Sequence, residues 1–303
     1  MSNAIAGASR GANALVDLLL VVGTGMMGGS VAAAVKKRGV AQQIIGVDTQ
    51  AAADAKALGI VDHALAKVSD LLTLSLSEGR TIGVVVAAPV KHYPTIFSEL
   101  SQLHQRRPLN WVTDIGSTKT GVIKASSALG MLASQFVSSH PMAGSERSGA
   151  RAANADLFEG ARVLISRLAN SREAAVSAVE EFWLALGSDP TPLPIEDHDA
   201  LLAAISHLPH VLAYSLAGSL AQGHLAGAAQ ALHGGGLRDT TRVAASSPEL
   251  WADIFLDNRD ALLQSWGDWS LQVQALRQAI EANDRELLLE LLSQAAQWRK
   301  GLQ

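Results

Sequence analysis

Short apolar runs alternate with helix-like segments through the first half of the chain. The apolar runs lie at residues 18–22, 44–47, 82–88, 111–114, 136–138 and 162–165. Segments with helical patterning lie between or after them, at 29–35, 51–58, 94–103, 119–129 and 172–186. Strands that alternate with helices are typical of a doubly wound, mostly parallel sheet. We therefore predict an α/β fold for this half of the chain.

The pattern changes after a proline-rich connector at 187–194, beyond which there is no convincing strand. A long helix is predicted through the apolar positions Leu201, Ile205, Leu208, Leu212 and Leu216. Asp197 or Asp199 is expected to cap its N-terminus. Further helices are predicted at 248–258, 259–273 and 284–299. The second half is therefore predicted to be all-helical.

A glycine-rich turn, GTGMMG at 23–28, joins the first apolar run to the helix that follows it. Gly23 permits a tight turn, Gly25 leaves room for a pyrophosphate, and Gly28 lets the helix pack close to the strand. The free N–H groups at the start of the helix then bind the phosphates. The alternative is a turn that only packs strand on helix. We predict a bound dinucleotide. The cofactor-binding residues are Gly23, Thr24, Gly25, Met26, Met27, Gly28, Asp48, Ala88 and Ser117.

Asp48 ends the second apolar run, 20 positions after Gly28. A carboxylate at this place accepts hydrogen bonds from the ribose hydroxyls of the adenosine and repels a 2′-phosphate. The sequence therefore predicts NAD rather than NADP as cofactor. If the turn binds nothing, Asp48 is a surface turn residue.

These patterns predict three parts. Residues 1–14 form a flexible tail, 15–192 a Rossmann-type dinucleotide-binding domain, and 193–303 an all-α domain that covers the cofactor cleft and forms a homodimer. The dimer is expected because charged residues make up only 17% of the chain, which suggests that surface is hidden in an interface.

Composition narrows the class of protein further. The net charge of −4 and the lack of a Lys/Arg block give no field that recruits nucleic acid. The absence of cysteine excludes disulfides, thiolate catalysis and cysteine–metal sites. No unbroken apolar stretch of about eighteen residues occurs, and the first residues do not fit a secretory signal. A cytoplasmic protein without a membrane span is expected.

Two polar residues follow predicted strands, at the edge of the sheet where ligands collect in open α/β folds. His140 comes after the run at 136–138, and its imidazole can exchange a proton near neutral pH. Ser117 follows the run at 111–114 and could orient both a nicotinamide and His140. The alternatives are a structural histidine before Pro141 and a helix N-cap at Ser117.

His207 and His210 lie three residues apart in the long helix, so both rings share one side. No acidic or cysteine neighbour completes a ligand set within that turn, so we expect them to face substrate and not a metal. Two hydrogen-bonded helix histidines are the alternative. Pro209 removes a backbone donor and is expected to kink the helix.

A triple glycine opens the segment 234–242, which is predicted to be a flexible loop carrying Arg238 and Arg242. Guanidinium groups pair bidentately with carboxylates, so these arginines indicate an anionic ligand. Solvated arginines on a C-capping loop are the alternative.

Taken together, the chain resembles the prephenate/arogenate dehydrogenase family of tyrosine biosynthesis. The resemblance rests on segments in the family's order, at 23–28, 114–119, 140–146, 149, 157–160, 206–210, 234–242 and 251–254. It implies an oxidative decarboxylation in which prephenate loses hydride from C4 to NAD⁺ and then carbon dioxide, giving 4-hydroxyphenylpyruvate. It leaves the choice between prephenate and arogenate open, and a dual-substrate cyclohexadienyl dehydrogenase is an alternative.

The resemblance also implies a role for each site residue. His140 would hydrogen-bond the C4 hydroxyl and take its proton, supported by Ser117, which also contacts the nicotinamide. His210 and Arg242 would face the far end of the substrate, with Arg242 as carboxylate anchor. His207 and Arg238 are the further substrate-binding candidates, and no metal is required.

Two more distant alternatives are a β-hydroxyacid dehydrogenase and a non-enzymatic NAD-sensing protein. The former would need a catalytic lysine in the helical domain, and the sequence has no lysine between Ser171 and Arg299. The latter does not explain why His140, Ser117, His210 and Arg242 occur together. No fused chorismate mutase segment and no C-terminal regulatory domain are expected.

Overall fold

The computed structural model describes residues 14–75, 77, 79–144 and 147–302, so most of the predicted tail and residues 145–146 of the 140–146 segment lie outside it. The chain divides into two compact units. Unit 1 comprises Met1–Asp199 and Ala245–Asp257, and unit 2 comprises Ala200–Ala244 and Asn258–Gln303. The expected domain boundary at 192/193 stays a prediction.

Unit 1 is built on an eight-stranded sheet in the order β3-β2-β1-β4-β5-β6-β7-β8. The strands are β1 Val16–Val22, β2 Ala41–Val47, β3 His63–Leu65, β4 Ile82–Val86, β5 Trp111–Asp114, β6 Phe136–Pro141, β7 Arg162–Arg167 and β8 Asp189–Pro192. All neighbouring strands run parallel except β6 and β7. The chain order reverses at β1, between β2 and β4, which is where open α/β sheets bind ligands.

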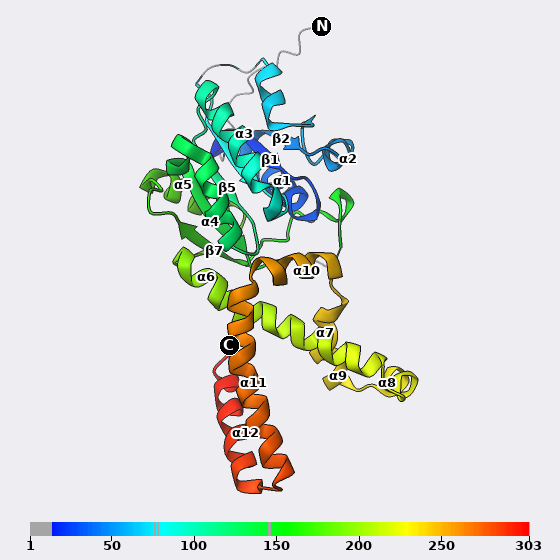
Figure 1. Ribbon diagram of the computed structural model, residues 1–303. Coiled ribbons are helices and arrows are strands. Elements are labelled where there is room, and N and C mark those ends of the chain that lie inside the picture. The colour runs from blue at the N-terminus through cyan, green and yellow to red at the C-terminus, as the bar shows by residue number, and fades with distance from the viewer. Residues whose placement is uncertain (1–13, 76, 78, 145–146, 303) are drawn as a thin grey trace. The chain divides into compact units, whose positions relative to one another are not determined.

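Helices surround this sheet and make up unit 2 (Figure 1). The α-helices are α1 Met26–Arg38, α2 Ala51–Ala57, α3 Tyr93–Arg106, α4 Thr120–Ser126, α5 Glu173–Ala185, α6 Ile195–Leu202, α7 Leu208–Ala221, α8 Ala226–Leu232, α9 Gly235–Thr241, α10 Pro248–Asp257, α11 Arg259–Glu281 and α12 Arg285–Lys300. Short 3₁₀ segments are Val68–Thr73, Val90–His92, Ser127–Gln135, Ala150–Ala152 and Arg242–Ala245, and Ala203–His207 is π-helical.

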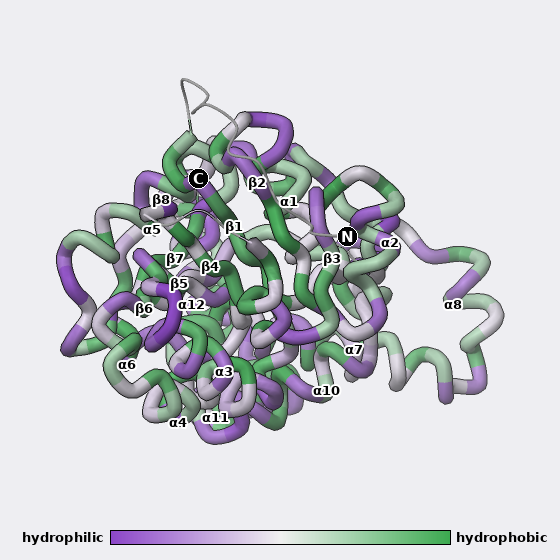
Figure 2. Tube along the Cα trace, turned by 90° about the horizontal axis from the view of Figure 1, so that it is seen from above, coloured by the Kyte–Doolittle hydropathy of each residue, from purple (hydrophilic) through white to green (hydrophobic). Residues whose placement is uncertain are grey.

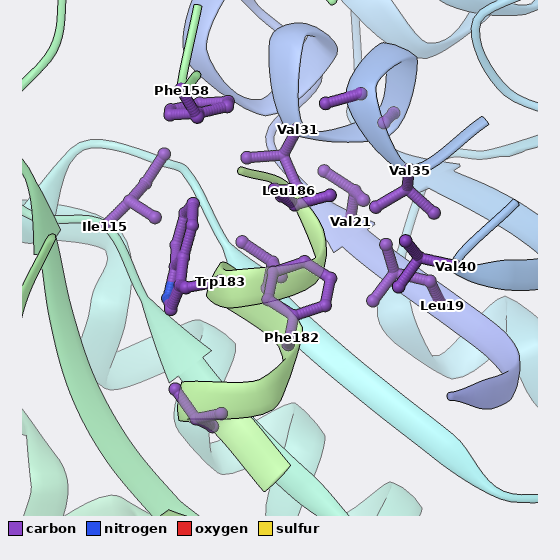
Figure 3. Packing of buried hydrophobic residues seen from close by; sticks show 14 of the residues in the cluster. Leu19, Val21, Val31, Val35, Val40, Ile115, Phe158, Phe182, Trp183 and Leu186 are labelled. Carbon is purple, nitrogen blue, oxygen red and sulfur yellow. The ribbon is translucent and has the colours of Figure 1, made fainter. Parts of the chain in front are cut away.

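The sheet has a hydrophobic core on each face. On one face, side chains of β1 and α1 pack with Phe182 and Trp183 of α5 (Figure 3). On the other face, the alternate residues of β1 pack with Tyr93 and Phe97 of α3. All of β1 is buried, and Figure 2 draws it almost wholly in the hydrophobic colour. Burying one such large apolar side chain stabilises the fold by about 1.5–3 kcal/mol.

Unit 2 contains only helices among its described residues. Helices α11 and α12 run side by side and are joined at Asn283, whose positive φ of 51° makes the turn (Figure 1). Asp284 caps α12 by accepting a hydrogen bond from the Leu287 amide at 3.0 Å. The prediction of a doubly wound α/β part followed by an all-helical part is confirmed.

Two local expectations about secondary structure are wrong. The proline-rich connector holds the edge strand β8, where proline costs little because an edge strand leaves amides unpaired. The segment 234–242 is not a loop but helix α9, which packs along α7. Glycine weakens a helix by only about 1 kcal/mol per residue, so packing overrides it.

The long helix also begins elsewhere than expected. It starts at Ile195, so both Asp197 and Asp199 lie inside it rather than at its cap. Its hydrogen-bond ladder widens to a π turn just before Pro209, which then sits in the first turn of α7 where a missing N–H is tolerated. By length and composition alone, the stretch Ile195–Ala221 could cross a membrane. Core helices of soluble proteins have the same length and composition, so one such helix is only weak evidence for a membrane span.

Candidate active site

The glycine turn between β1 and α1 leaves space at one position only. A Cβ on Gly23, whose φ is +90°, would lie 2.7 Å from the Ala87 carbonyl, and one on Gly28 would lie 1.8 Å from the Gly23 carbonyl. A Cβ on Gly25 would meet nothing within 4 Å. Gly23 and Gly28 are therefore needed for packing, while the backbone at Gly25 is open to an incoming group.

The start of α1 is free of side chains that would compete with an anion. Gly25 is its N-cap, without a capping hydrogen bond, and its first turn holds no acidic residue. The buried hydroxyl of Thr24 has no hydrogen-bond partner among the described residues. Met26 and Met27 form the first turn, and the Ala88 amide lies beside Gly23. A helix N-terminus without a competing side chain suits the pyrophosphate of a dinucleotide.

Asp48 is held beside this turn. Its Oδ2 accepts from the Thr24 amide at 3.0 Å, and its Oδ1 accepts from the amides of Gln50 at 2.9 Å and Ala51 at 3.0 Å. These bonds fix the carboxylate at the tip of β2 and leave a further lone-pair position on Oδ2. The arrangement suits ribose hydroxyls and disfavours a 2′-phosphate.

His140 lies near the end of β6 and contacts a second histidine that sequence reasoning missed. Its Nδ1 is 2.9 Å from Nε2 of His198, and Nδ1 of His198 is 2.8 Å from Oδ1 of Asp199. His140 is 9% exposed and His198 is fully buried. His198 lies 58 residues from His140 along the chain, and no local pattern in the sequence joins them.

The Asp199 carboxylate accepts hydrogen bonds from backbone amides at the N-terminus of α4. Its two oxygens accept from the amides of Lys119 and Thr120 and from the Thr120 hydroxyl, each at 2.7 Å. Burial opposes its ionisation, but the hydrogen bonds from His198, Thr120 and Lys119 together hold the pKa of Asp199 well below its ordinary value. The alternative that Ser117 caps this helix is wrong, because α4 begins at Thr120 with Lys119 as N-cap.

A buried ion pair between Lys119 and Asp114 links the ends of β5 and β6. Nζ of Lys119 donates to Asp114 Oδ2 at 2.8 Å and to the carbonyls of Gly116 at 2.9 Å and Ser139 at 2.8 Å. Burial lowers the pKa of Lys119, and the charge of Asp114 opposes that change. Gly116 and Ser139 directly precede Ser117 and His140, so one ammonium ties together the backbone before both candidates.

Ser117 is half-buried after β5, whose Asp114 is paired in register with Ser138 of the neighbouring β6. The structure therefore brings Ser117 and His140 to the same edge of the sheet. The role of Ser117 toward His140 and a nicotinamide stays a prediction.

In unit 2 the four predicted substrate residues lie in three different surroundings. His210 donates from Nδ1 to the Ser206 carbonyl at 2.9 Å. Its pKa is lowered by burial and also by the nearby charge of Arg242, so these two lie together. His207, in contrast, is buried with its Nδ1 3.0 Å from Asn258 Nδ2. Arg238 is largely exposed and lies 3.6 Å from Asp239. The binding roles of all four stay predictions.

In the described part of the chain, no group of three His, Cys, Asp or Glu side chains could hold a metal ion.

Two family models match the chain. The one described as "Prephenate dehydrogenase, nucleotide-binding domain" matches residues 31–189, and "Prephenate dehydrogenase, dimerization domain" matches residues 194–294. The chain belongs to the prephenate dehydrogenase family. The resemblance drawn from the sequence motifs is thereby confirmed.

Relatives support this membership over nearly the whole chain. A prephenate dehydrogenase of Bacillus subtilis is 33% identical over 96% of this chain and 77% of its own length. A cyclohexadienyl dehydrogenase of Zymomonas mobilis is 30% identical over 94% of this chain and 95% of its own length. Among solved structures, prephenate dehydrogenase from A. aeolicus in complex with hydroxyphenyl propionate and NAD⁺ is 28% identical, with a TM-score of 0.83 over 95% of this chain and 98% of that one.

Proposed function

We propose that this member of the prephenate dehydrogenase family is an NAD-dependent enzyme that converts prephenate to 4-hydroxyphenylpyruvate and carbon dioxide. One structural observation carries the proposal. The glycine turn with its open backbone at Gly25 follows β1, and the buried His140 lies near the end of β6 of the same sheet in unit 1. Relatives named prephenate dehydrogenase and a similar structure holding NAD⁺ support it.

The cofactor is NAD, which when bound would supply the acceptor for the hydride that leaves C4 of the substrate. The open backbone at Gly25 and the first N–H groups of α1 hold the pyrophosphate. The fixed carboxylate of Asp48 binds the ribose hydroxyls. Thr24, Met26, Met27 and Ala88 contribute backbone and side-chain contacts around the same turn.

His140 hydrogen-bonds the C4 hydroxyl and takes its proton as the hydride leaves. The resulting ketone lets the ring carboxylate leave as carbon dioxide, and the ring becomes aromatic. The overall conversion of prephenate and NAD⁺ to 4-hydroxyphenylpyruvate, carbon dioxide and NADH releases no net proton. The proton held by His140 can therefore return to the same oxygen, which becomes the phenol.

Substrate orientation is assigned to the remaining residues. Arg242 pairs with a substrate carboxylate, His210 beside it binds the side chain of the substrate, and Ser117 orients the nicotinamide and His140. His207 and Arg238 are secondary candidates, since His207 is buried with Asn258 and Arg238 is exposed beside Asp239.

We also propose a cytoplasmic homodimer formed through the helical part. The match to a dimerization domain supports the dimer, as do the apolar side chains exposed on α11 and α12, among them Trp266 and Trp298. No affinity for nucleic acid or membranes is proposed.

A second candidate is activity with arogenate, favoured by the similarity to a cyclohexadienyl dehydrogenase. The test is NADH formation at 340 nm with prephenate and, separately, with arogenate. Prephenate with NAD⁺ should give the higher kcat/KM. A higher kcat/KM for arogenate would reassign the substrate, and no NADH with either would overturn the proposal.

A further inference from the structure

We propose that His198 and Asp199 are positioning residues that keep a proton on Nδ1 of His140, so that Nε2 is the atom that takes the substrate's proton. The inference rests on the proposed role of His140 and goes beyond it. Two hydrogen bonds carry it: His140 Nδ1 to His198 Nε2 at 2.9 Å, and His198 Nδ1 to Asp199 Oδ1 at 2.8 Å.

Which atom donates in each of these two hydrogen bonds follows from the charge of the Asp199 carboxylate. Asp199 is ionised and accepts from the Lys119 and Thr120 amides and from the Thr120 hydroxyl, so it has no proton to donate. The proton between Asp199 and His198 therefore sits on Nδ1 of His198. A neutral imidazole has a single N–H, which leaves Nε2 of His198 as an acceptor. It can accept only from Nδ1–H of His140.

His198 stays neutral in this place because it is fully buried. Burial is the main reason that its pKa is lowered, the charge of Lys119 lowers it further, and Asp199 and Asp114 oppose the change. Among the described residues, the titratable groups that face it are Asp199 on its own helix, Asp114 at the end of β5, Lys119 at the N-cap of α4, and His140 on β6. A neutral His198 is what lets Nδ1–H of His140 act as the donor.

The arrangement also stabilises the imidazolium form of His140 once it has taken the proton. The imidazolium of His140 still donates from Nδ1 to His198, and His198 in turn donates to the Asp199 carboxylate. The negative charge is fixed because the N-terminus of α4 holds both of its oxygens. The role is positioning: His198 and Asp199 act through His140 and are not assigned any contact with substrate.

The tautomer can be read directly in the folded wild-type protein. Histidine labelled with ¹⁵N, assigned by comparison with His140→Asn, should show a protonated Nδ1 and an unprotonated Nε2 for His140 at neutral pH. A protonated Nε2 with a bare Nδ1 would overturn the inference whatever the variants do.

Kinetics supply the second test. His198→Leu should lower kcat by about ten- to a thousandfold, below the full worth of a general base, with KM for prephenate little changed. It should also move the acidic limb of the kcat–pH profile. His198→Gln, whose amide can accept from His140 and donate to Asp199, should recover at least about tenfold of kcat. His104→Leu, at a half-buried histidine of α3 that accepts from the Leu109 amide, is the matched control.

A purely structural role makes a different forecast. His198→Leu would then lower the melting temperature but keep the wild-type pH profile, like His104→Leu, and that result overturns the inference. Failure of the proposed function looks different again: His140→Asn would retain full activity. If His140→Asn is inactive and the wild type shows the opposite tautomer, only the positioning inference fails.

Discussion

The buried ion pair between Lys119 and Asp114 gives a sharp stability prediction. In Lys119→Met the side chain keeps a similar length but loses the ammonium. Asp114 and the carbonyls of Gly116 and Ser139 then lose a donor, where the side chains of Lys119 and Asp114 are 1% and 0% exposed. Removing one partner of a buried pair costs about 3–5 kcal/mol, because the remaining charge is left uncompensated.

That cost is large against a total stability of about 5–15 kcal/mol for a domain. For a unit of this size, each kcal/mol shifts the melting temperature by about 2–4 °C, so Lys119→Met should melt about 6–20 °C below the wild type. Adding Asp114→Asn removes the stranded charge and should recover about 1–3 kcal/mol of the loss, since neutralising both partners is less costly than neutralising one.

The assay is thermal unfolding followed by circular dichroism, with kcat measured on the same samples well below the melting temperature. If Lys119→Met melts within about 2 °C of the wild type, the pair does not hold the strand ends. If the double variant melts below the single one, the uncompensated charge on Asp114 is not the source of the loss.

Three further predictions concern the cofactor, the substrate and pH. Asp48→Ser should relax the preference for NAD⁺ over NADP⁺, read from the ratio of kcat/KM values; an unchanged ratio would remove Asp48 from ribose recognition. Arg242→Gln should raise KM for prephenate about ten- to a hundredfold, the worth of about 1.5–3 kcal/mol for a charged hydrogen bond, and Lys should restore only part of it. If both variants keep the wild-type KM, Arg242 does not bind the substrate carboxylate and Arg238 becomes the candidate for that role. Because burial holds the pKa of His198 below its ordinary 6.5, the unfolded state binds more protons there, so stability should fall as pH drops below about 6.5. Urea unfolding of the wild type and His198→Gln should show a smaller fall in the variant, and equal slopes would exclude His198 as the cause.

Elements with strong local patterns could be predicted from the sequence. The run at 111–114 is strand β5 as expected, and α5 covers Glu173–Ala185 within the predicted 172–186. The glycine turn could also be predicted, because Gly23 and Gly28 answer local steric demands and Gly25 leaves its backbone open. Helix α9 and strand β8 could not, because packing on α7 and pairing with β7 override glycine and proline propensities.

The candidate site likewise contains residues that could be predicted from the sequence and residues that could not. His140 could be predicted as a candidate because a histidine just after an apolar run is visible locally. His198 and Asp199 could not, since their place in the candidate site comes from a contact that spans 58 residues and from the N-terminus of a different helix. The sequence suggests Asp199 only as a possible cap, and its carboxylate does accept from the amides at a helix N-terminus, but that of α4 rather than its own.

The central claim is tested most directly by product stoichiometry in wild type and His140→Asn. With prephenate and NAD⁺, the wild type should form NADH, carbon dioxide and 4-hydroxyphenylpyruvate in equal amounts. His140→Asn keeps a hydrogen-bond donor but loses the proton acceptor, so kcat should fall by about 10²–10⁴ while NAD⁺ affinity stays unchanged. NADH without carbon dioxide, no NADH at all, or wild-type kcat in His140→Asn would contradict the account.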